Sequence, residues 1–143
     1  MKQLLSVVAG VLAISTLGCS QRLNEKDLPE PVKTSFSKAY DSPGKVKWEK
    51  ENKNEYEASF VLNGKEISVV YSNDGILQET ETEITVAELP ASVTEYITKN
   101  YKNAKISEAA KIIKKDGSIV FEAEVNKKDL LFDASGKLLK TDD

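Results

Sequence analysis

The chain has 143 residues, no histidine, and a single cysteine, Cys19. Without histidine, catalytic triads and metal centres that depend on imidazole are excluded. One thiol excludes an internal disulfide, and we do not expect a catalytic cysteine or a cysteine-based metal site. Glycine-rich phosphate loops and the Gly-x-Ser-x-Gly nucleophile turn are also missing. We therefore expect no enzyme and no cofactor, and a fold held together by its hydrophobic core.

The chain also lacks a concentration of positive charge. It contains 20 basic and 23 acidic residues, and the formal net charge is −3. The two signs are interspersed along the sequence, whereas a nucleic-acid-binding surface needs clustered lysine and arginine. We therefore expect no nucleic-acid partner.

What the chain does have begins with an apolar N-terminal segment. Lys2 supplies a positive charge, and residues 4–17 are apolar or small and carry no charge. This segment is shorter than the ~20 residues that span a bilayer. Its length suits the hydrophobic part of a signal peptide.

The end of this segment resembles a bacterial lipobox, because Gly18 stands directly before Cys19. In such signals the cysteine is lipidated and becomes the first residue of the mature protein. Thr16 and Leu17 depart from the usual pattern, and the alternative is an ordinary secretory signal with a chance cysteine. We expect a lipoprotein-type signal in residues 1–19 and a short polar tether in residues 20–27. The protein would then be anchored in the cell envelope facing the periplasm, or secreted if Cys19 is not lipidated.

The rest of the chain repeats itself. Leu28-Pro29 and Leu89-Pro90 each precede a segment with apolar residues at helical spacing. Proline is well placed at the start of a helix, where its missing N–H is not needed. The apolar positions correspond in the two segments: Val32 with Val93, Phe36 with Ile97, and Tyr40 with Tyr101.

After each helical segment the apolar period changes from helix-like to strand-like. In the first copy, Asn63-Gly64 is a strong hairpin signal because both turn residues favour positive φ. In the second copy, Asp116-Gly117 has a similar role, and residues 105–115 predict a strand with a bulge because their alternation slips. The sequence "YSNDGIL" from Tyr71 is repeated as "FDASGKLL" from Phe132. Each copy therefore predicts four strands after its helix.

We conclude that the fold class is α+β, with two tandem repeats of a helix and a four-stranded antiparallel meander. The repeats cover about residues 28–84 and 85–143 and form one domain. Because each sheet has an apolar face that a helix only partly covers, we expect them to join into one curved sheet with the helices on one face.

This arrangement resembles the PepSY-like, beta-lactamase-inhibitor-like family of Bacteroidetes envelope proteins. The residues that carry the resemblance are the two Leu-Pro segments, "EYEASF" with "FEAEV", and "YSNDGIL" with "FDASGKLL". The resemblance implies a two-repeat fold with a curved sheet, an envelope location, and a role in binding or inhibiting another protein. It implies no functional residue, and fold alone does not fix function.

Two aromatic residues are candidates for protein binding. Trp48 stands opposite Glu108 when the copies are aligned, so it has no aromatic counterpart and is a candidate exposed anchor. Tyr96 is offset from the apolar stripe of its helix and is a second candidate. The alternative for both residues is an ordinary place in the core.

Three acidic residues form a candidate cation site. Glu79, Glu81 and Glu83 alternate along the sequence, so an extended strand places them on one face. Carboxylates on one face suit a hard cation or a basic partner, but a solvated strand face is the favoured alternative.

These observations predict a non-catalytic, lipid-anchored envelope module that engages or inhibits another protein or peptide through its sheet. Two alternatives remain open. The protein is a structural or assembly lipoprotein without a dedicated ligand, or it carries a small ligand or a cation.

Overall fold

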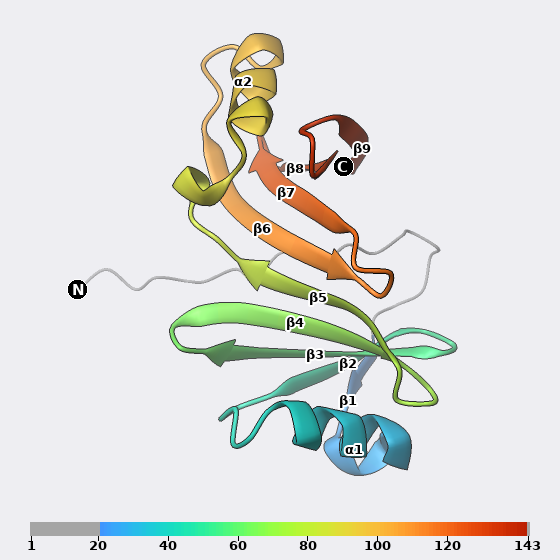
Figure 1. Ribbon diagram of the computed structural model, residues 1–143. Helices are drawn as coiled ribbons and strands as arrows, with labels where there is room; N and C mark the ends of the chain where they lie inside the picture. Colours follow the sequence, from blue (N-terminus) through green and yellow to red (C-terminus); the bar gives the residue numbers. More distant parts are fainter. Residues whose placement is uncertain (1–20, 143) are drawn as a thin grey trace, which may run out of the picture.

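The computed structural model describes residues 21–142 (Figure 1). This part of the chain contains nine strands, two α-helices and two short 3₁₀ helices. In chain order these elements are β1 (Gln21–Leu23), η1 (Glu25–Asp27), α1 (Glu30–Ala39), β2 (Lys47–Asn52), β3 (Glu55–Leu62), β4 (Lys65–Ser72), β5 (Leu77–Glu83), η2 (Val86–Glu88), α2 (Ala91–Asn100), β6 (Ile106–Lys114), β7 (Ile119–Val125), β8 (Lys128–Asp133) and β9 (Leu138–Asp142).

The strands form one antiparallel sheet in the order of the sequence, from β1 to β9. A helix is followed by four strands twice, as α1 with β2–β5 and as α2 with β6–β9. The predicted fold class is therefore confirmed. The two meanders join edge to edge, because β5 of the first repeat pairs with β6 of the second.

One strand was not predicted. Residues 20–27 were expected to form a tether because they are polar, but residues 21–27 form β1 and η1. In β1, Leu23 pairs with Trp48 of β2 and packs against the hydrophobic core. Residues 21–23 therefore belong to the edge of the sheet, and the tether prediction is corrected accordingly.

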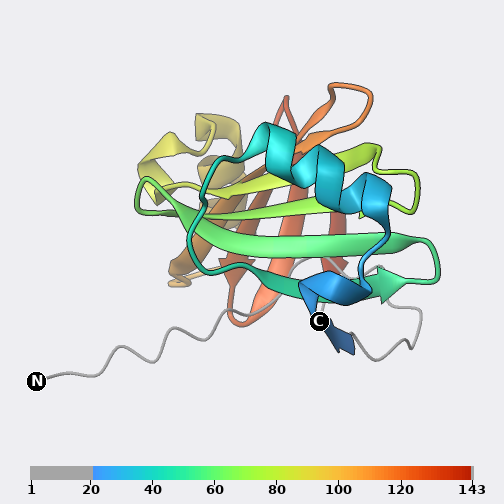
Figure 2. The same cartoon turned by 90° about the horizontal axis from the view of Figure 1, so that it is seen from below.

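The two helices cover the same side of the curved sheet, one over each repeat (Figures 1 and 2). Beneath them lie two separate clusters of buried apolar residues. The first cluster is Leu28, Val32, Phe36, Trp48, Tyr56, Ala58, Phe60, Val69 and Tyr71. The second is Leu89, Val93, Ile97, Ala109, Ala123, Val125, Leu130 and Phe132.

The repeated turn sequences join each meander to its helix. Gly75, between β4 and β5, lies so close to α1 that an added Cβ would be 2.3 Å from the carbonyl oxygen of Pro31. Gly136, between β8 and β9, lies equally close to α2, where an added Cβ would be 2.0 Å from Oγ of Ser92. Both glycines have positive φ. The two repeats therefore use the same glycine contact to hold the helix against its sheet.

Within residues 21–142, no helix is long and apolar enough to cross a membrane.

Candidate functional site

The side of the sheet away from the helices, which we call the open face, is rich in carboxyl groups. Side chains alternate between the two sides of a strand, so Glu57, between the core residues Tyr56 and Ala58, lies on the open face. The cross-strand register places further acidic residues on the same face. They include Glu49, Glu79, Glu81, Glu83, Glu108, Glu122, Glu124, Asp129 and Asp142.

Glu57 is buried on this face, with 2% of its surface exposed. Its Oε1 accepts hydrogen bonds from Oγ of Ser68 at 2.5 Å and from Oγ of Ser59 at 3.0 Å. The pKa of the neighbouring Glu51 is raised to about 8. The larger cause is its hydrogen bond with Glu57, and the second cause is burial. The carboxyl group of Glu51 is therefore largely protonated at neutral pH.

Glu122 occupies in the second repeat the position of Glu57 in the first. It is 8% exposed, and its Oε2 is buried without a hydrogen-bond partner. Burial raises the pKa of Glu122 to about 9, and the carboxyl groups of Glu81, Asp129, Glu108 and Asp142 add to the shift. Its carboxyl group is therefore protonated at neutral pH.

Glu81 of β5 has a similar environment. Burial raises its pKa to about 8, and the carboxyl groups of Glu57, Glu79 and Asp129 raise it further, while Lys114 opposes them. Its Oε2 is also buried and without a hydrogen-bond partner. Buried polar atoms in folded proteins are normally paired, so these oxygens need a physical explanation.

Apolar residues on the same face explain the burial of these acids. Ala110 pairs with Glu122, and Ile112 pairs with Glu81. Val70 and Leu131 belong to the same face by register. These four residues are 0–6% exposed although the helices lie on the other side of the sheet. The carboxyl groups of the open face thus stand among apolar side chains, where their charged forms are disfavoured.

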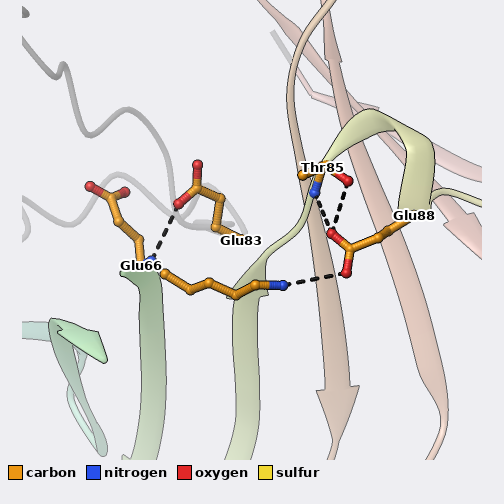
Figure 3. A network of polar contacts seen from close by, with 5 residues as sticks. Glu66, Glu83, Thr85 and Glu88 are labelled. Carbon is orange, nitrogen blue, oxygen red and sulfur yellow. Dashed lines mark hydrogen bonds and ion pairs between the residues drawn. The ribbon is translucent and has the colours of Figure 1, made fainter. Parts of the chain in front are cut away.

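The three acids predicted as a cation site have different surroundings. Glu79 forms an ion pair with Nζ of Lys114. Oε2 of Glu83 accepts a hydrogen bond of 3.3 Å from the backbone N–H of Glu66 (Figure 3). The favoured alternative for these three acids was a solvated strand face. It is corrected for Glu81, whose carboxyl group is buried. In residues 21–142, no group of three or more acidic or cysteine side chains is arranged to hold a metal ion.

Polar contacts next to Glu83 fix the junction between the repeats. Oε2 of Glu88 in η2 accepts hydrogen bonds from the backbone N–H of Thr85 at 2.7 Å and from its Oγ1 at 2.9 Å (Figure 3). Oε1 of Glu88 pairs with Nζ of Lys65 at 3.3 Å. The hydrogen bonds from Thr85 lower the pKa of Glu88. This carboxylate is therefore engaged in holding the chain between β5 and α2.

Trp48 is not an exposed anchor. It is 4% exposed, and its ring meets that of Phe36 edge to face, with 5.0 Å between the ring centroids. The bulge in β6 between Ile106 and Glu108 shifts the register by one residue, so the counterpart of Trp48 is the buried Ala109. Trp48 pairs with Ala58 just as Ala109 pairs with Ala123. The mistaken alignment with Glu108 caused the wrong expectation of an exposed side chain.

Tyr96 lies on α2, on the side of the sheet that carries the helices. It is partly buried against the second core cluster, and its ring meets Phe132 edge to face, with 5.4 Å between the ring centroids. It is therefore not part of the open face. A binding role for its exposed edge stays a prediction.

Sequence reasoning aligned Glu57 with Glu122 but did not select them as site residues. The signal was present, because each is a glutamate flanked by an aromatic residue and an alanine at the same place in both repeats. Flanking residues that face the core place the glutamate on the opposite side of the sheet, but they do not show that it is buried there. Cys19, the predicted lipidation site, lies outside the described residues.

Several solved structures have a fold similar to that of this chain. Solved structures similar to it include a "putative periplasmic protein" of Bacteroides eggerthii, at 21% identity and a TM-score of 0.72, which covers 80% of this chain and 87% of that one. A DUF2874 family protein of Bacteroides uniformis has 19% identity, a TM-score of 0.69, and coverage of 79% and 87%. A BLIP-like protein of Bacteroides fragilis has 22% identity, a TM-score of 0.59, and coverage of 81% and 86%.

No curated protein matches the chain. A family match, in contrast, extends over almost all of the described residues. It covers residues 18–79 and again the overlapping residues 54–140, and a family that matches the chain twice fits a repeated fold. The chain therefore belongs to the family described as "Putative beta-lactamase-inhibitor-like, PepSY-like".

Proposed function

We propose that the protein is a non-catalytic binding module of the cell envelope that faces the periplasm and engages another protein through the open face of its sheet. The observation that carries this proposal is the pair of buried carboxyl oxygens on Glu81 and Glu122, for which residues 21–142 supply no hydrogen-bond partner. Unpaired buried polar atoms reduce stability, so a surface that retains two of them is better explained by a partner than by folding alone.

The family and the relatives support this proposal. The family description and one similar structure both refer to a beta-lactamase inhibitor, a protein that acts by binding another protein. Another similar structure is described as periplasmic. We also propose that Cys19 carries a lipid, since it follows an apolar segment that ends in glycine. The proposed module is thus tethered to a membrane and presents its sheet to a partner.

Photo-cross-linking in cells of the source organism tests the use of the open face. Val61 of β3 pairs with Glu66 on this face and is 55% exposed. Lys38 of α1 is exposed on the helix side and provides the matched control position. A benzophenone amino acid in place of Val61 should give a discrete adduct with another protein, and the same amino acid in place of Lys38 should give none. An adduct from Lys38 alone, or none from either position, contradicts the proposal.

A further inference from the structure

The open face has carboxyl groups on many strands and few positive charges to pair with them. Ion pairs engage Glu49 with Lys47, Glu79 with Lys114, and Asp142 with Lys140. The second oxygen of Asp142, like those of Glu81 and Glu122, is buried and without a partner. A cationic group from outside the chain would therefore complement this face.

Among the residues that the structure describes, no free cation stands beside Glu81 and Glu122. Arg22 is the only arginine of the chain, and it lies on β1 opposite Glu49. The strand order places β1 four strands from Glu81 and six from Glu122. Two lysines of the face, Lys114 and Lys140, are engaged with Glu79 and Asp142. Within residues 21–142, the two acids therefore leave room for a cation from another molecule.

The surroundings of the two acids favour an organic cation over a metal ion. A calcium ion requires six to eight oxygen ligands, and the described residues contain no group of three acids arranged to hold a metal. Ala110 and Ile112 of β6 lie between Glu81 and Glu122. Apolar surroundings suit the weakly hydrated guanidinium better than a strongly hydrated ammonium group, and its planar fork donates to two carboxyl oxygens at once.

We propose that the open face binds an arginine side chain of the partner protein, with the carboxyl groups of Glu81 and Glu122 as its ligands. This inference rests on the proposed function and names the chemistry of the partner. The guanidinium donates hydrogen bonds to the carboxyl groups of Glu81 and Glu122, whose side chains have to turn outward because the oxygens without partners are closed to solvent in the free protein. As it arrives, the two acids together release one proton to the solvent, so that one carboxylate balances the charge of the guanidinium and the other carboxyl group stays neutral.

The charged groups around the two acids set the pH dependence of this step. They are Glu57 on β3, Glu79 on β5, Glu108 and Lys114 on β6, Asp129 on β8, and Asp142 with Lys140 on β9. Burial first, and then these mostly acidic neighbours, raise the pKa values of Glu81 and Glu122 and keep both protonated in the free protein. Binding should therefore release protons at pH 7, and the apparent affinity should rise as the pH increases towards 9.

Short peptides of defined sequence test the inference on the full chain in neutral detergent. The probes are blocked Ala-Ala-X-Ala-Ala peptides in which X is arginine, lysine or the neutral isostere citrulline. The ¹³C signals of the glutamate carboxyl groups report binding, and calorimetry at pH 7 in phosphate and in Tris reports proton release. We expect the arginine peptide to shift the signals of Glu81 and Glu122, to release protons, and to bind at least tenfold more tightly than the citrulline peptide.

Three variants complete the design. Glu81→Gln and Glu122→Gln should each weaken the arginine peptide at least tenfold, and they keep the neutral state that these side chains have in the free protein. Glu95→Gln removes one charge from the exposed side of α2 and should bind as wild type does. Tryptophan fluorescence of the buried Trp48 confirms that each variant is folded.

Several results would overturn the inference. One is that the citrulline or the lysine peptide binds as tightly as the arginine peptide. Another is that Glu122→Gln binds the arginine peptide as tightly as wild type does. A third is that calcium chloride alone shifts the carboxyl signals of Glu81 and Glu122. A Val61 cross-link that persists unchanged in the Glu81→Gln, Glu122→Gln double variant would overturn the arginine assignment and leave the proposed function intact. Loss of that cross-link in the double variant but not in Glu95→Gln supports both.

Discussion

At the scale of single residues, the distinctive feature is a set of acids that the fold keeps protonated. A carboxyl group with a raised pKa binds a proton more tightly in the folded state than in the unfolded state. Its contribution to stability is therefore largest at low pH and is lost as the pH rises through the folded pKa. For Glu81 and Glu122 this window extends from the ordinary glutamate value of 4.5 to about 8 and about 9.

The first prediction concerns how the stability of the protein changes with pH. The free energy of unfolding should fall between pH 5 and pH 9, by up to about 4–5 kcal/mol for each of the two acids, because each unit of pKa shift corresponds to about 1.4 kcal/mol. Glu122→Gln should flatten the curve and make the protein more stable than wild type at pH 9. Urea unfolding at several pH values measures this, with Glu95→Gln as the control. Parallel curves for wild type and Glu122→Gln would contradict the assignment.

The second prediction concerns Trp48, whose ring packs in the first core cluster. Trp48→Ala should lower the free energy of unfolding by about 3–5 kcal/mol, the usual cost of removing a large buried aromatic side chain. Urea unfolding followed by circular dichroism measures the loss. If the variant keeps wild-type stability, Trp48 is not part of the core, and the hypothesis that it is an exposed anchor is supported instead.

At the scale of elements, the two repeats hold their helices through the glycine turns. The third prediction is that Gly75→Ala lowers the free energy of unfolding by about 2–4 kcal/mol. The new Cβ meets the carbonyl oxygen of Pro31, and the backbone has positive φ. Gly117→Ala is the matched control, since Gly117 also has positive φ but has no atom within 4 Å of an added Cβ. It should cost only about 1–2 kcal/mol.

Gly136 adds an internal check to this prediction. The nearest atom to its added Cβ belongs to the side chain of Ser92, which can be removed, whereas Pro31 meets Gly75 with its backbone. Ser92→Gly should therefore recover part of the stability lost in Gly136→Ala. Equal stability of Gly75→Ala and Gly117→Ala in thermal unfolding would show that the contact with the helix is unimportant.

The elements were largely predictable because their signals are local. The Leu-Pro starts, the helical stripes and the Asn63-Gly64 turn each identify an element without reference to the rest of the chain. The one-residue register of β6 was not predictable, because a bulge leaves its alternation ambiguous, and this misplaced the counterpart of Trp48. The burial of Glu122 could not be predicted from the sequence either, because it depends on apolar neighbours from β6 and β8 that the fold brings together.

At the scale of the whole molecule, the domain has helices on one side of its sheet, an acidic face without helices on the other, and a proposed lipid anchor at its N-terminus. The fourth prediction concerns the anchor. Cys19→Ser should move the protein from the detergent phase to the aqueous phase of a Triton X-114 separation, because it removes the only residue that a lipoprotein signal can modify. Metabolic labelling with an alkyne fatty acid measures the modification directly. Labelling that persists in Cys19→Ser would contradict the proposed anchor.

The central claim is that the open face keeps carboxyl groups without partners for a ligand from another molecule. A ¹³C titration of the glutamate carboxyl groups of the free protein tests it most directly. The account predicts signals that titrate above pH 7 and disappear in Glu81→Gln and in Glu122→Gln. If every glutamate titrates below about pH 5.5, within the range of ordinary solvated carboxyl groups, the acids of the open face are hydrated and the account is contradicted.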